Sequence, residues 1–520
     1  MSKSNKDFLQ KYQKQIHWTL FGIFMCIGIF ARIWQFGIVP GDINQDEALA
    51  GYEAYSLLHY GKDSSGYTFP VYLTAWGSGM NVLNSLLMIP FIAVFGLKTW
   101  VIRTPQLIVA CLTLWVLYLI INEIIDEKAA LVSLFLAAIT PWHIMLARWG
   151  LESNLAPGFL LFGLYFFIRG LKQAKFFILS ALMYGLSLYC YATIWPFVPV
   201  ILLLQLIYCL IYKKIKLQKE TILSVVLLFV MALPLLLFLL INNDYMNEIR
   251  LPFMSIPKLV YMRDSEISFS NIPENWKNLW GIITSQTDGL PWNSTERFGL
   301  FYPISLPFFL IGLFYYLKKV ALGFKNKEFS MDIFVIIQLL AGIFLGLLIN
   351  VNINRVNCLW LPMLIMIATG IWYLCKLINL KLLIIPLVIY SILFIQFEQY
   401  YFTDYKAEIY GYFCGGLEDA MEEATSHEGT IYVTSSANYA RVMFYSKQDV
   451  EEYISTVQYT NYPSPFLDVS SFGRFQFYFD LNALDPTGIY LVDSSVDPAH
   501  FTNAGYTTKS FGYYTVAWMQ

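Results

Sequence analysis

The chain has 520 residues, of which 57% are hydrophobic and only 13% are charged, and its mean hydropathy is +0.54. A soluble domain carries about a quarter charged residues, so this composition indicates a protein that crosses a bilayer several times. The net charge of −2 excludes the strongly basic surface that nucleic-acid-binding proteins use.

Eleven apolar windows are long enough to cross a bilayer. A further stretch, 81–96, is shorter and contains Asn81, Asn84, Ser85 and Pro90. The first window is too long for the core of a signal peptide, so we expect it to remain as an anchor. The windows are residues 17–37, 104–122, 128–147, 155–171, 175–193, 195–213, 220–242, 299–318, 331–350, 356–375 and 381–399.

The basic residues between the windows predict the orientation, because Lys and Arg are enriched in cytoplasmic loops. All basic loops lie on the side of the N-terminal tail only if stretch 81–96 does not cross. We therefore predict that 81–96 is interfacial or re-entrant and that the N-terminus is cytoplasmic. The basic residues are Lys3, Lys6, Lys11 and Lys14 in the tail, then Arg169, Lys172, Lys175, Lys213, Lys214, Lys216, Lys219, Lys318, Lys319, Lys325, Lys327, Lys376 and Lys381.

These assignments divide the chain into three parts. Residues 1–16 form a cytoplasmic tail, and residues 17–403 form an α-helical membrane domain with external loops at about 38–103 and 243–298. Residues 404–520 lose the apolar pattern and predict a small extracytoplasmic α/β domain. Its expected strands are Thr430–Thr434, Gly488–Val492 and Tyr513–Trp518, and its expected helix is Leu417–Thr425.

The first external loop contains two adjacent carboxylates, Asp46 and Glu47, which are costly to place near lipid and therefore indicate function. Asn44 can cap a helix that runs to about Tyr60 and ends at Gly61, with Glu47 as its capping-box partner. Adjacent helical residues point about 100° apart, so the two carboxylates cannot act on one atom. We assign the chemistry to Asp46 and leave Glu47 as either a cap or a substrate ligand.

A second charged pair, Arg148 and Glu152, follows a later window. Its i,i+4 spacing fits a helix salt bridge, which is worth only a few tenths of a kcal/mol. Its expected position on the same face as Asp46 favours a role in a site. Arg355 begins another span on that face and either extends to the interface or binds a phosphate.

The long loop 243–298 ends with a turn at Asp288 and Gly289, followed by Trp292 and Asn293. Trp292 and Asn293 could bind a polar ligand, or the loop could pack on the membrane surface. The sequence leaves both interpretations open.

The sequence contains no evident metal site or nucleotide site. Its five histidines lack metal-ligand spacing, and no Cys/His cluster occurs. It also lacks a phosphate-binding loop and a GxSxG motif, so it does not resemble an ATPase or a serine hydrolase. No cofactor is required, although a divalent metal could bind at Asp46 and Glu47.

Three local patterns together resemble the GT-C membrane glycosyltransferases. Within that group they are most similar to the bacterial protein O-mannosyltransferase and aminoarabinose transferase branch. The similarity covers roughly residues 15–400, and Asp46–Leu58 is the closest local match. The patterns are the Asp46–Glu47 pair in the first external loop, the run Pro141–Glu152 after a later span, and the run Asn352–Asn357 near the last spans.

This resemblance implies a membrane enzyme that takes a sugar from a polyprenyl-phosphate donor and transfers it with inversion on the extracytoplasmic face. It implies that Asp46 is the catalytic base and that the region of Arg148 and Glu152 completes the site. We expect Arg355 to bind the donor phosphate, with Arg148 and Arg103 as alternatives. The sugar or its acceptor, which could be a glycan, a lipid or a protein, is expected to contact Glu47, Tyr52, His143, Asp288, Trp292 and Asn293.

One segment departs from the family pattern. The interfacial helix often begins with Pro-Pro or a lysine in the family, whereas this chain has Gly77-Ser78-Gly79-Met80-Asn81. If that lysine helps to bind phosphate, one of the three arginines must replace it here.

Two other functions are alternatives. A GT-C ligase would transfer a larger lipid-linked glycan, and a donor assay would distinguish it. A polytopic lipid or sugar transporter should show inverted repeats and charges near the bilayer midplane. The chain shows no internal repeat, and its charges gather towards one surface, which disfavours transport.

Overall fold

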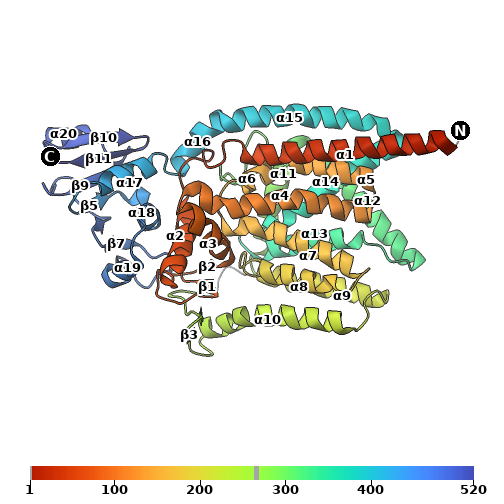
Figure 1. Cartoon of the computed structure of the whole chain (residues 1–520), viewed down its shortest axis with the longest axis horizontal. Helices are drawn as coiled ribbons and strands as arrows, with labels where there is room; N and C mark the ends of the chain where they lie inside the picture. The colour runs from red at the N-terminus through yellow and green to blue at the C-terminus, as the bar shows by residue number, and fades with distance from the viewer. Residues whose placement is uncertain (1–2, 263–268, 520) are drawn as a thin grey trace.

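The computed structural model of the protein describes residues 3–262 and 269–519. Long helices lie side by side in a bundle, with the C-terminal domain at one end and the start of the first helix at the other (Figure 1). Each of the eleven predicted windows corresponds to one helix of this bundle. The helices are α1 (Lys3–Ile33), α4 (Thr99–Ile124), α5 (Glu127–Ile139), α7 (Ala156–Gly170), α8 (Phe176–Ser187), α9 (Ile194–Ile211), α10 (Lys219–Asn242), α12 (Leu306–Asn326), α13 (Ile333–Leu348), α14 (Asn357–Ile378) and α15 (Ile384–Phe402).

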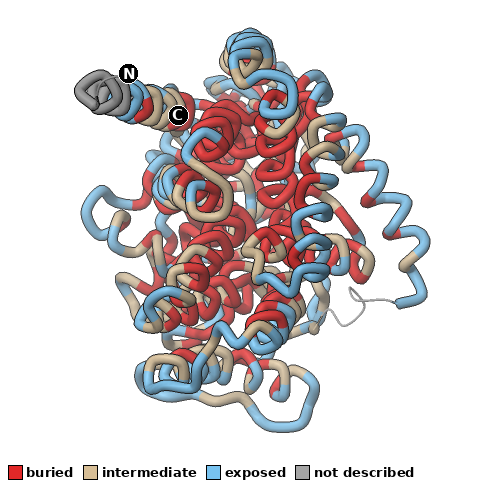
Figure 2. The backbone as a smooth tube through the Cα atoms, turned by 90° about the vertical axis from the view of Figure 1, so that its right-hand side faces the viewer, coloured by how far each residue is buried: buried red, intermediate tan, exposed pale blue. Residues whose placement is uncertain are grey.

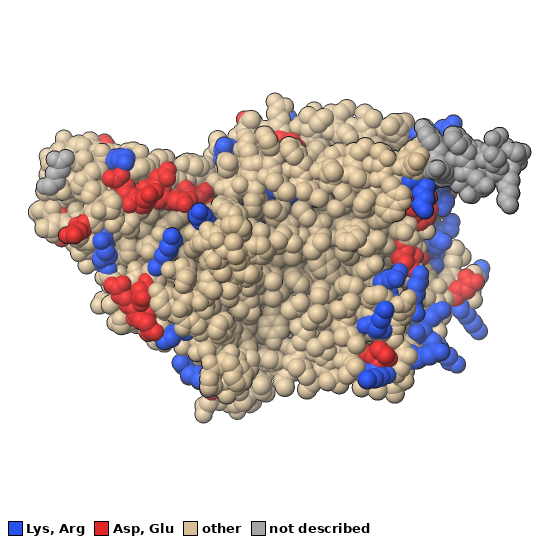
Figure 3. Space-filling model, in the orientation of Figure 1, with Lys and Arg blue, Asp and Glu red and all other residues tan. Residues whose placement is uncertain are grey.

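The bundle has the properties of a multi-pass membrane protein. Among the described residues, seven helices are long and apolar enough to span a bilayer: α1, α4, α9, α10, α12, α14 and α15. The helices α5, α7, α8 and α13 are shorter, with 12 to 16 residues. Figure 3 shows Lys and Arg gathered at the end of the bundle where α1 begins, both acidic and basic residues on the C-terminal domain, and a band with almost no charge between them. Such a band fits the hydrocarbon core of a membrane.

Helix α14 is the central helix. Of its apolar window, 89% is buried, compared with 17% for α10 and 11% for the span that contains α15. Figure 2 shows the same arrangement from the end, with buried residues in the middle and exposed residues outside. Glycines allow α12 to approach α14 closely, because a Cβ atom at Gly312 would lie 1.8 Å from the Met366 carbonyl oxygen and one at Gly370 would lie 2.0 Å from that of Phe308.

The loop between α1 and α4 folds at the end of the bundle that carries the C-terminal domain (Figure 1). Helix α2 (Gln45–Tyr60) begins at Asn44, whose Oδ1 accepts the Asp46 N–H at 3.0 Å, while the Asn44 N–H donates to Glu47 Oε1 at 3.0 Å. The helix ends at Gly61 in the left-handed conformation. The predicted bounds of α2 and its capping box are therefore confirmed.

Helix α3 (Leu83–Phe95) occupies the short apolar stretch at 81–96. Its 13 residues make it about 20 Å long, which is less than the roughly 30 Å of a hydrocarbon core. It contacts α2 and α4 at the outer end of the bundle (Figure 1). The stretch therefore forms a short helix, and its interfacial or re-entrant position stays a prediction.

Short elements connect the helices of the membrane domain. They are β1 (Tyr72–Leu73), β2 (Met80–Asn81), α6 (Pro141–Leu146), η1 (Glu152–Leu155), β3 (Ile249–Leu251), β4 (Met254–Ile256), α11 (Ile272–Ser285), η3 (Pro303–Ser305), η4 (Leu380–Leu383) and α16 (Asp404–Tyr412).

The C-terminal domain is built on a seven-stranded sheet of order β10-β11-β9-β5-β8-β7-β6, in which β5 is parallel to β8 and β9. The three predicted strands correspond to β5, β9 and β11, and the predicted helix is α17. The other elements were not predicted from the sequence. The domain contains α17 (Leu417–Thr425), β5 (Ile431–Val433), η5 (Ser435–Ala437), α18 (Tyr439–Ser446), α19 (Val450–Thr456), β6 (Gln458–Tyr459), β7 (Val469–Phe472), β8 (Phe475–Gln476), β9 (Ile489–Asp493), α20 (Ala499–Asn503), β10 (Thr507–Phe511) and β11 (Tyr514–Trp518).

The C-terminal domain is attached next to the start of α2. The Asp42 carboxylate accepts the Gly416 N–H before α17 and the Tyr445 hydroxyl, the latter at 2.6 Å. Arg441 of α18 donates through Nε to the Ile43 carbonyl at 3.0 Å. The residues just before α2 therefore connect the two domains.

Arg148 caps the end of α1. Helix C-termini leave carbonyls without partners inside the helix, and a cation there satisfies them. The segment between α6 and η1 is not helical, so Arg148 and Glu152 do not form the alternative i,i+4 helix pair. The Arg148 guanidinium donates at 2.8 to 3.2 Å to the carbonyls of Ala31, Arg32, Trp34, Gln35 and Val39.

Glu47 and Arg103 form an ion pair between α2 and α4, and both side chains are fully buried. Arg103 also donates to the carbonyls of Pro40 at 2.7 Å and Asp42 at 2.6 Å. Glu47 accepts the Gly150 N–H at 2.6 Å. The pair thus joins the segment before α2, α2 itself, α4 and the connection from α6 to η1.

We predict that Arg103→Met destabilises the protein by about 3–5 kcal/mol, because it leaves the Glu47 carboxylate buried without its cation. The double variant Glu47→Gln/Arg103→Met should recover part of this loss. Thermal unfolding in detergent measures the effect, and Lys62→Ala, which breaks the exposed pair with Glu451, is the control and should cost less than about 1 kcal/mol. An Arg103→Met protein as stable as the wild type would contradict this role.

Candidate active site

A cavity of about 770 Å³ lies where α2, the loop before α3 and η1 face α9, α10 and the loop before α14. Small-molecule sites usually have volumes of about 300–1,000 Å³. Four of the predicted site residues line this cavity: Asp46, Glu152, Trp292 and Arg355. They come from four segments that are far apart in the sequence, so the fold brings them together.

The two carboxylates at the cavity have different surroundings. Asp46 is half-buried at the N-terminus of α2, where the cap at Asn44 holds its backbone. Glu152 begins η1, and its Oε2 accepts the Asn81 N–H at 2.5 Å. Glu152 therefore also fixes the strand β2 that forms one wall of the cavity.

Arg355 faces the same cavity from the loop before α14. Its backbone N–H donates to Asn352 Oδ1 at 2.8 Å, and its carbonyl accepts the Thr193 hydroxyl at 3.0 Å. Its Nη1 donates to the Asn350 carbonyl at 3.2 Å. These bonds hold the loop in place, and Arg355 has further interactions beyond them.

Asp288 supports this loop from the side. Its Oδ2 accepts the Ile353 N–H at 2.9 Å and the Asn293 side-chain amide at 2.7 Å, and its Oδ1 accepts the Leu290 N–H at 3.0 Å. Asp288 and Asn293 therefore form a turn that positions the Arg355 loop. Neither lines the cavity, so the structure replaces their predicted substrate contact with this role.

The cavity has a polar part and an apolar part. Tyr72, Trp195 and Phe238 pack on one another, with ring centroids 4.5 to 6.1 Å apart. Polar side chains surround the carboxylates. The apolar lining is completed by Pro196, Leu239, Leu259, Met262, Leu345 and Ile349, and the polar lining includes Gln45, Ser78, Tyr191, Thr193, Asn243, Asn352 and Asn354.

Two predicted phosphate ligands have structural roles instead. Arg103 is buried against Glu47, and Arg148 is buried against the end of α1. Neither lines the cavity. Each is surrounded by carbonyl or carboxylate acceptors, so the structure corrects the expectation that they contact a donor phosphate.

Three predicted substrate contacts also face away from the cavity. Glu47 pairs with Arg103, the Tyr52 hydroxyl donates to the Gln448 carbonyl at 2.8 Å, and His143 Nδ1 lies 2.6 Å from Arg32 Nη2. All three side chains are buried. Glu47 holds the start of α2, Tyr52 joins α2 to the C-terminal domain, and His143 contacts Arg32 at the end of α1.

Several lining residues were missed in the sequence. Ser78 lies in the segment Gly77–Asn81, and Trp76 directly precedes that segment. Tyr191 and Thr193 lie between two apolar spans. Phe466 belongs to the C-terminal domain. In the sequence, the polar residues between α8 and α9 were the one available sign of these lining residues, because they stand where two apolar windows meet.

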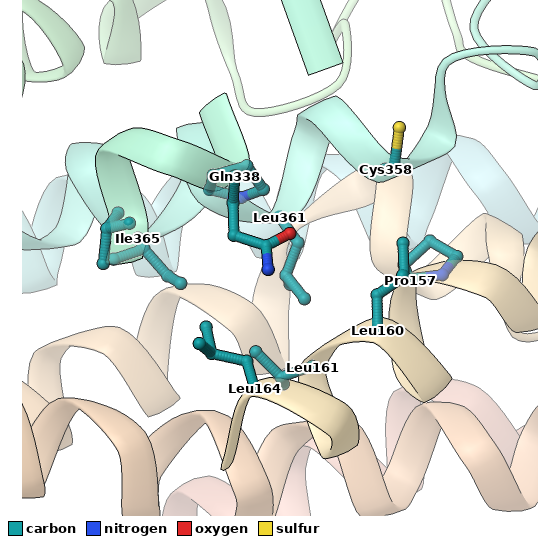
Figure 4. A pocket seen from close by; sticks show the side chains of 10 residues that line it. Pro157, Leu160, Leu161, Leu164, Gln338, Cys358, Leu361 and Ile365 are labelled. Atoms are coloured by element: carbon teal, nitrogen blue, oxygen red, sulfur yellow. The ribbon is translucent and has the colours of Figure 1, made fainter. Parts of the chain in front are cut away.

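A second, much smaller cavity lies inside the bundle between α7, α13 and α14 (Figure 4). Its volume is about 20 Å³, which is room for roughly one water molecule. Leu161, Leu164, Leu361 and Ile365 make its lining largely apolar. It is too small for a substrate.

The described residues contain no group of three or more His, Cys, Asp or Glu side chains that could hold a metal ion. Among the described residues that line the cavity, Asp46 and Glu152 are the carboxylates.

Comparison with known proteins identifies the fold. Residues 82–254 match the family model of dolichyl-phosphate-mannose-protein mannosyltransferase. The structure resembles ArnT from Cupriavidus metallidurans in the apo state, with a TM-score of 0.53 and 11% identity over 98% of each chain. The chain has the GT-C glycosyltransferase fold. The GT-C fold expected from the sequence is therefore confirmed.

Two further structures have the same GT-C architecture. ArnT from the same organism bound to undecaprenyl phosphate gives a TM-score of 0.55 and 10% identity over 96% of this chain and 97% of that one. The Archaeoglobus fulgidus oligosaccharyltransferase complex with Zn and sulfate gives 0.50 and 13% identity over 82% of this chain and 61% of that one. A search of curated proteins finds no match.

The first external loop of this GT-C fold contains a buried acid pair, Glu53 and Asp63, each 1% exposed. Glu53 accepts the Ser64 N–H at 2.9 Å, and Asp63 accepts the N–H groups of Ser65 at 3.0 Å and Tyr67 at 2.8 Å. Burial and the neighbouring Asp63 raise the pKa of Glu53 to about 8. Burial also raises the pKa of Asp63, to about 7.

We predict that the free energy of unfolding falls as the pH rises from about 4 to about 8. In this window the folded acids retain protons that the unfolded chain has released, so higher pH favours unfolding. The double variant Glu53→Gln/Asp63→Asn should weaken this pH dependence. Thermal unfolding in detergent at a series of pH values tests it, with the exposed Glu451→Gln as control. An unchanged slope in the double variant would argue against the buried pair as its source.

Proposed function

We propose that the protein transfers a monosaccharide, a hexose or a pentose, from a polyprenyl-phosphate donor to an acceptor hydroxyl, with inversion at the anomeric carbon. The observation that carries the proposal is that Asp46 and Arg355, a carboxylate and a guanidinium from distant segments, line one cavity that also has an apolar wall. A base, an anion-binding group and an apolar surface are the three parts that this reaction needs.

We propose that the reaction takes place on the extracytoplasmic side. Lys and Arg gather at the end of the bundle where α1 begins, which indicates that this end is cytoplasmic (Figure 3). The cavity and the C-terminal domain lie towards the opposite end (Figure 1). In this orientation the N-terminus is cytoplasmic and the C-terminal domain is extracytoplasmic.

The donor would lie along the cavity, with its phosphate beside a cation and its prenyl chain on apolar side chains. Arg355 suits the phosphate, because guanidinium binds such groups bidentately and stays charged. The prenyl chain would lie on the apolar wall of Trp195, Phe238 and Leu345. The ArnT structure bound to undecaprenyl phosphate supports this class of donor.

Asp46 would act as the general base. The acceptor hydroxyl gives its proton to the Asp46 carboxylate while its oxygen forms a bond to the anomeric carbon. The bond from that carbon to the phosphate oxygen breaks on the opposite face, and Arg355 stabilises the phosphate that leaves. Glu152 would hold the wall at β2 and contact the sugar.

The size of the cavity favours a single sugar. A volume of about 770 Å³ lies within the range for ligands of modest size, which supports monosaccharide transfer over transfer of a larger glycan. We propose no metal-dependent step. Glu47, which could have shared a divalent metal with Asp46, binds Arg103 instead.

We predict that Asp46→Asn lowers transfer by about 10²–10⁴-fold, because the amide cannot accept the proton. Expression of the variant in a deletion strain, followed by mass spectrometry of envelope and secreted material, should show the loss of one hexose or pentose. Asp419→Asn, on the exposed surface of α17, is the matched control and should restore the sugar. Full restoration by Asp46→Asn would exclude Asp46 as the base.

We predict that Arg355→Ala raises KM for the donor by about 10- to 100-fold, as expected for the loss of hydrogen bonds to a charged group. Arg355→Lys should recover part of the loss. Initial rates with undecaprenyl-phosphate monosaccharides measure it. Arg297→Ala, at an exposed position in the loop before α12, is the control. Unchanged donor KM in Arg355→Ala would contradict phosphate binding by this residue.

A further inference from the structure

The C-terminal domain contributes to the wall of the active-site cavity. Phe466 of the C-terminal domain lines the cavity, whereas the other described lining residues belong to the membrane domain. The side chain of Phe466 is 59% exposed. The segment around it is held in place, because the Leu467 N–H donates to the Trp76 carbonyl at 2.8 Å and Phe466 forms an antiparallel bridge with Gly77. Phe466 therefore has a defined position at the mouth of the cavity.

Gly77 makes this close approach feasible. Its φ is +90°, and a Cβ atom there would lie 2.7 Å from the Ser464 carbonyl oxygen. A side chain would therefore push segment 464–467 away from the loop before α3. This contact explains the glycine-rich segment that departs from the family pattern.

A second contact from the C-terminal domain lies beside Asp46. The Asn438 side-chain amide donates to Gln45 Oε1 at 2.8 Å, and Gln45 lines the cavity next to Asp46. The ring of Tyr439 meets Trp76 edge to face, with centroids 5.1 Å apart. The same domain therefore places an aromatic ring at the mouth and orients a neutral polar group near the base.

This mouth combines two aromatic residues, Trp76 and Phe466, with neutral hydrogen-bonding groups on Gln45 and Ser78. A sugar ring has the complementary surface, because its C–H face packs on an aromatic ring while its hydroxyls bind amides and hydroxyls. A fatty acyl chain has no hydroxyls for these polar groups and no flat face for the aromatic rings. The apolar residues that α9 and α10 contribute to the same cavity suit the prenyl chain of the donor.

We propose that the acceptor is a glycan and that Phe466 and Trp76 form its binding subsite. A terminal ring would pack on Phe466, and one of its hydroxyls would reach Asp46. The reaction then forms a glycosidic bond between that oxygen and the anomeric carbon, breaks the bond to phosphate and leaves the proton on Asp46. This inference rests on the function proposed above and assigns the C-terminal domain a role in acceptor specificity.

The experiment uses the full-length protein in nanodiscs with a panel of undecaprenyl-phosphate hexoses and pentoses. Donor cleavage is followed together with transfer to three acceptors: methyl glycosides of mono- and disaccharides, a Ser/Thr-containing peptide and diacylglycerol. We expect transfer to the glycosides. Phe466→Ala should raise KM for the glycoside about tenfold with a much smaller change in kcat.

Phe466→Trp should restore the glycoside KM, because it returns an aromatic face. Tyr478→Ala is the matched control, since Tyr478 is 53% exposed on the same domain and does not line the cavity. Unchanged KM in Phe466→Ala, or transfer to the peptide or diacylglycerol in preference to glycosides, would overturn the glycan subsite while donor cleavage upholds the proposed function. Absence of donor cleavage by the wild type would overturn the proposed function itself.

Discussion

The buried ion pair of Glu47 and Arg103 is the constraint on which the site depends. Taking two charges out of water is costly, and the pair persists because further groups satisfy it. Arg103 reaches the carbonyls of Pro40 and Asp42, and Glu47 reaches the Gly150 N–H. The start of α2 is therefore fixed relative to α4 and to the connection that leads to η1. Since Asp46 precedes Glu47 and Glu152 begins η1, one buried pair sets the relative position of both cavity carboxylates.

The same region couples the membrane domain to the C-terminal domain. The Asp42 carbonyl accepts from Arg103, while its carboxylate accepts the Gly416 N–H and the Tyr445 hydroxyl. The domain is thus bonded to the residues that lead into α2. Its segment 464–467 can then reach the cavity mouth at a defined distance from Asp46. An external domain that was only tethered by a linker could not hold Phe466 in such a place.

Local rules predicted much of the fold. The spans follow from apolar length, α2 from its cap at Asn44 and its stop at Gly61, and α3 from its short length and the basic loops. These features depend on residues close together in the sequence. The strands β6 to β8 and the helices α18 to α20 were missed, because they are short and are stabilised by tertiary packing rather than by a clear periodicity. For the site, Asp46, Glu152, Trp292 and Arg355 were placed at one cavity from the sequence.

The errors concern charges whose role depends on burial. In a chain with so few charges, Arg148 and Arg103 were kept as alternatives to Arg355 for the donor phosphate, and Glu47 as a possible substrate ligand. What separates them is where their partners lie. Arg148 is buried against carbonyls at the end of α1, and Arg103 is buried against Glu47, so neither side chain reaches the cavity. Arg355 instead stands in a loop whose backbone is held by Asn352 and Asp288, and its side chain lines the cavity. A sequence shows the number of cations, whereas only the fold shows which of them are buried and which line the cavity.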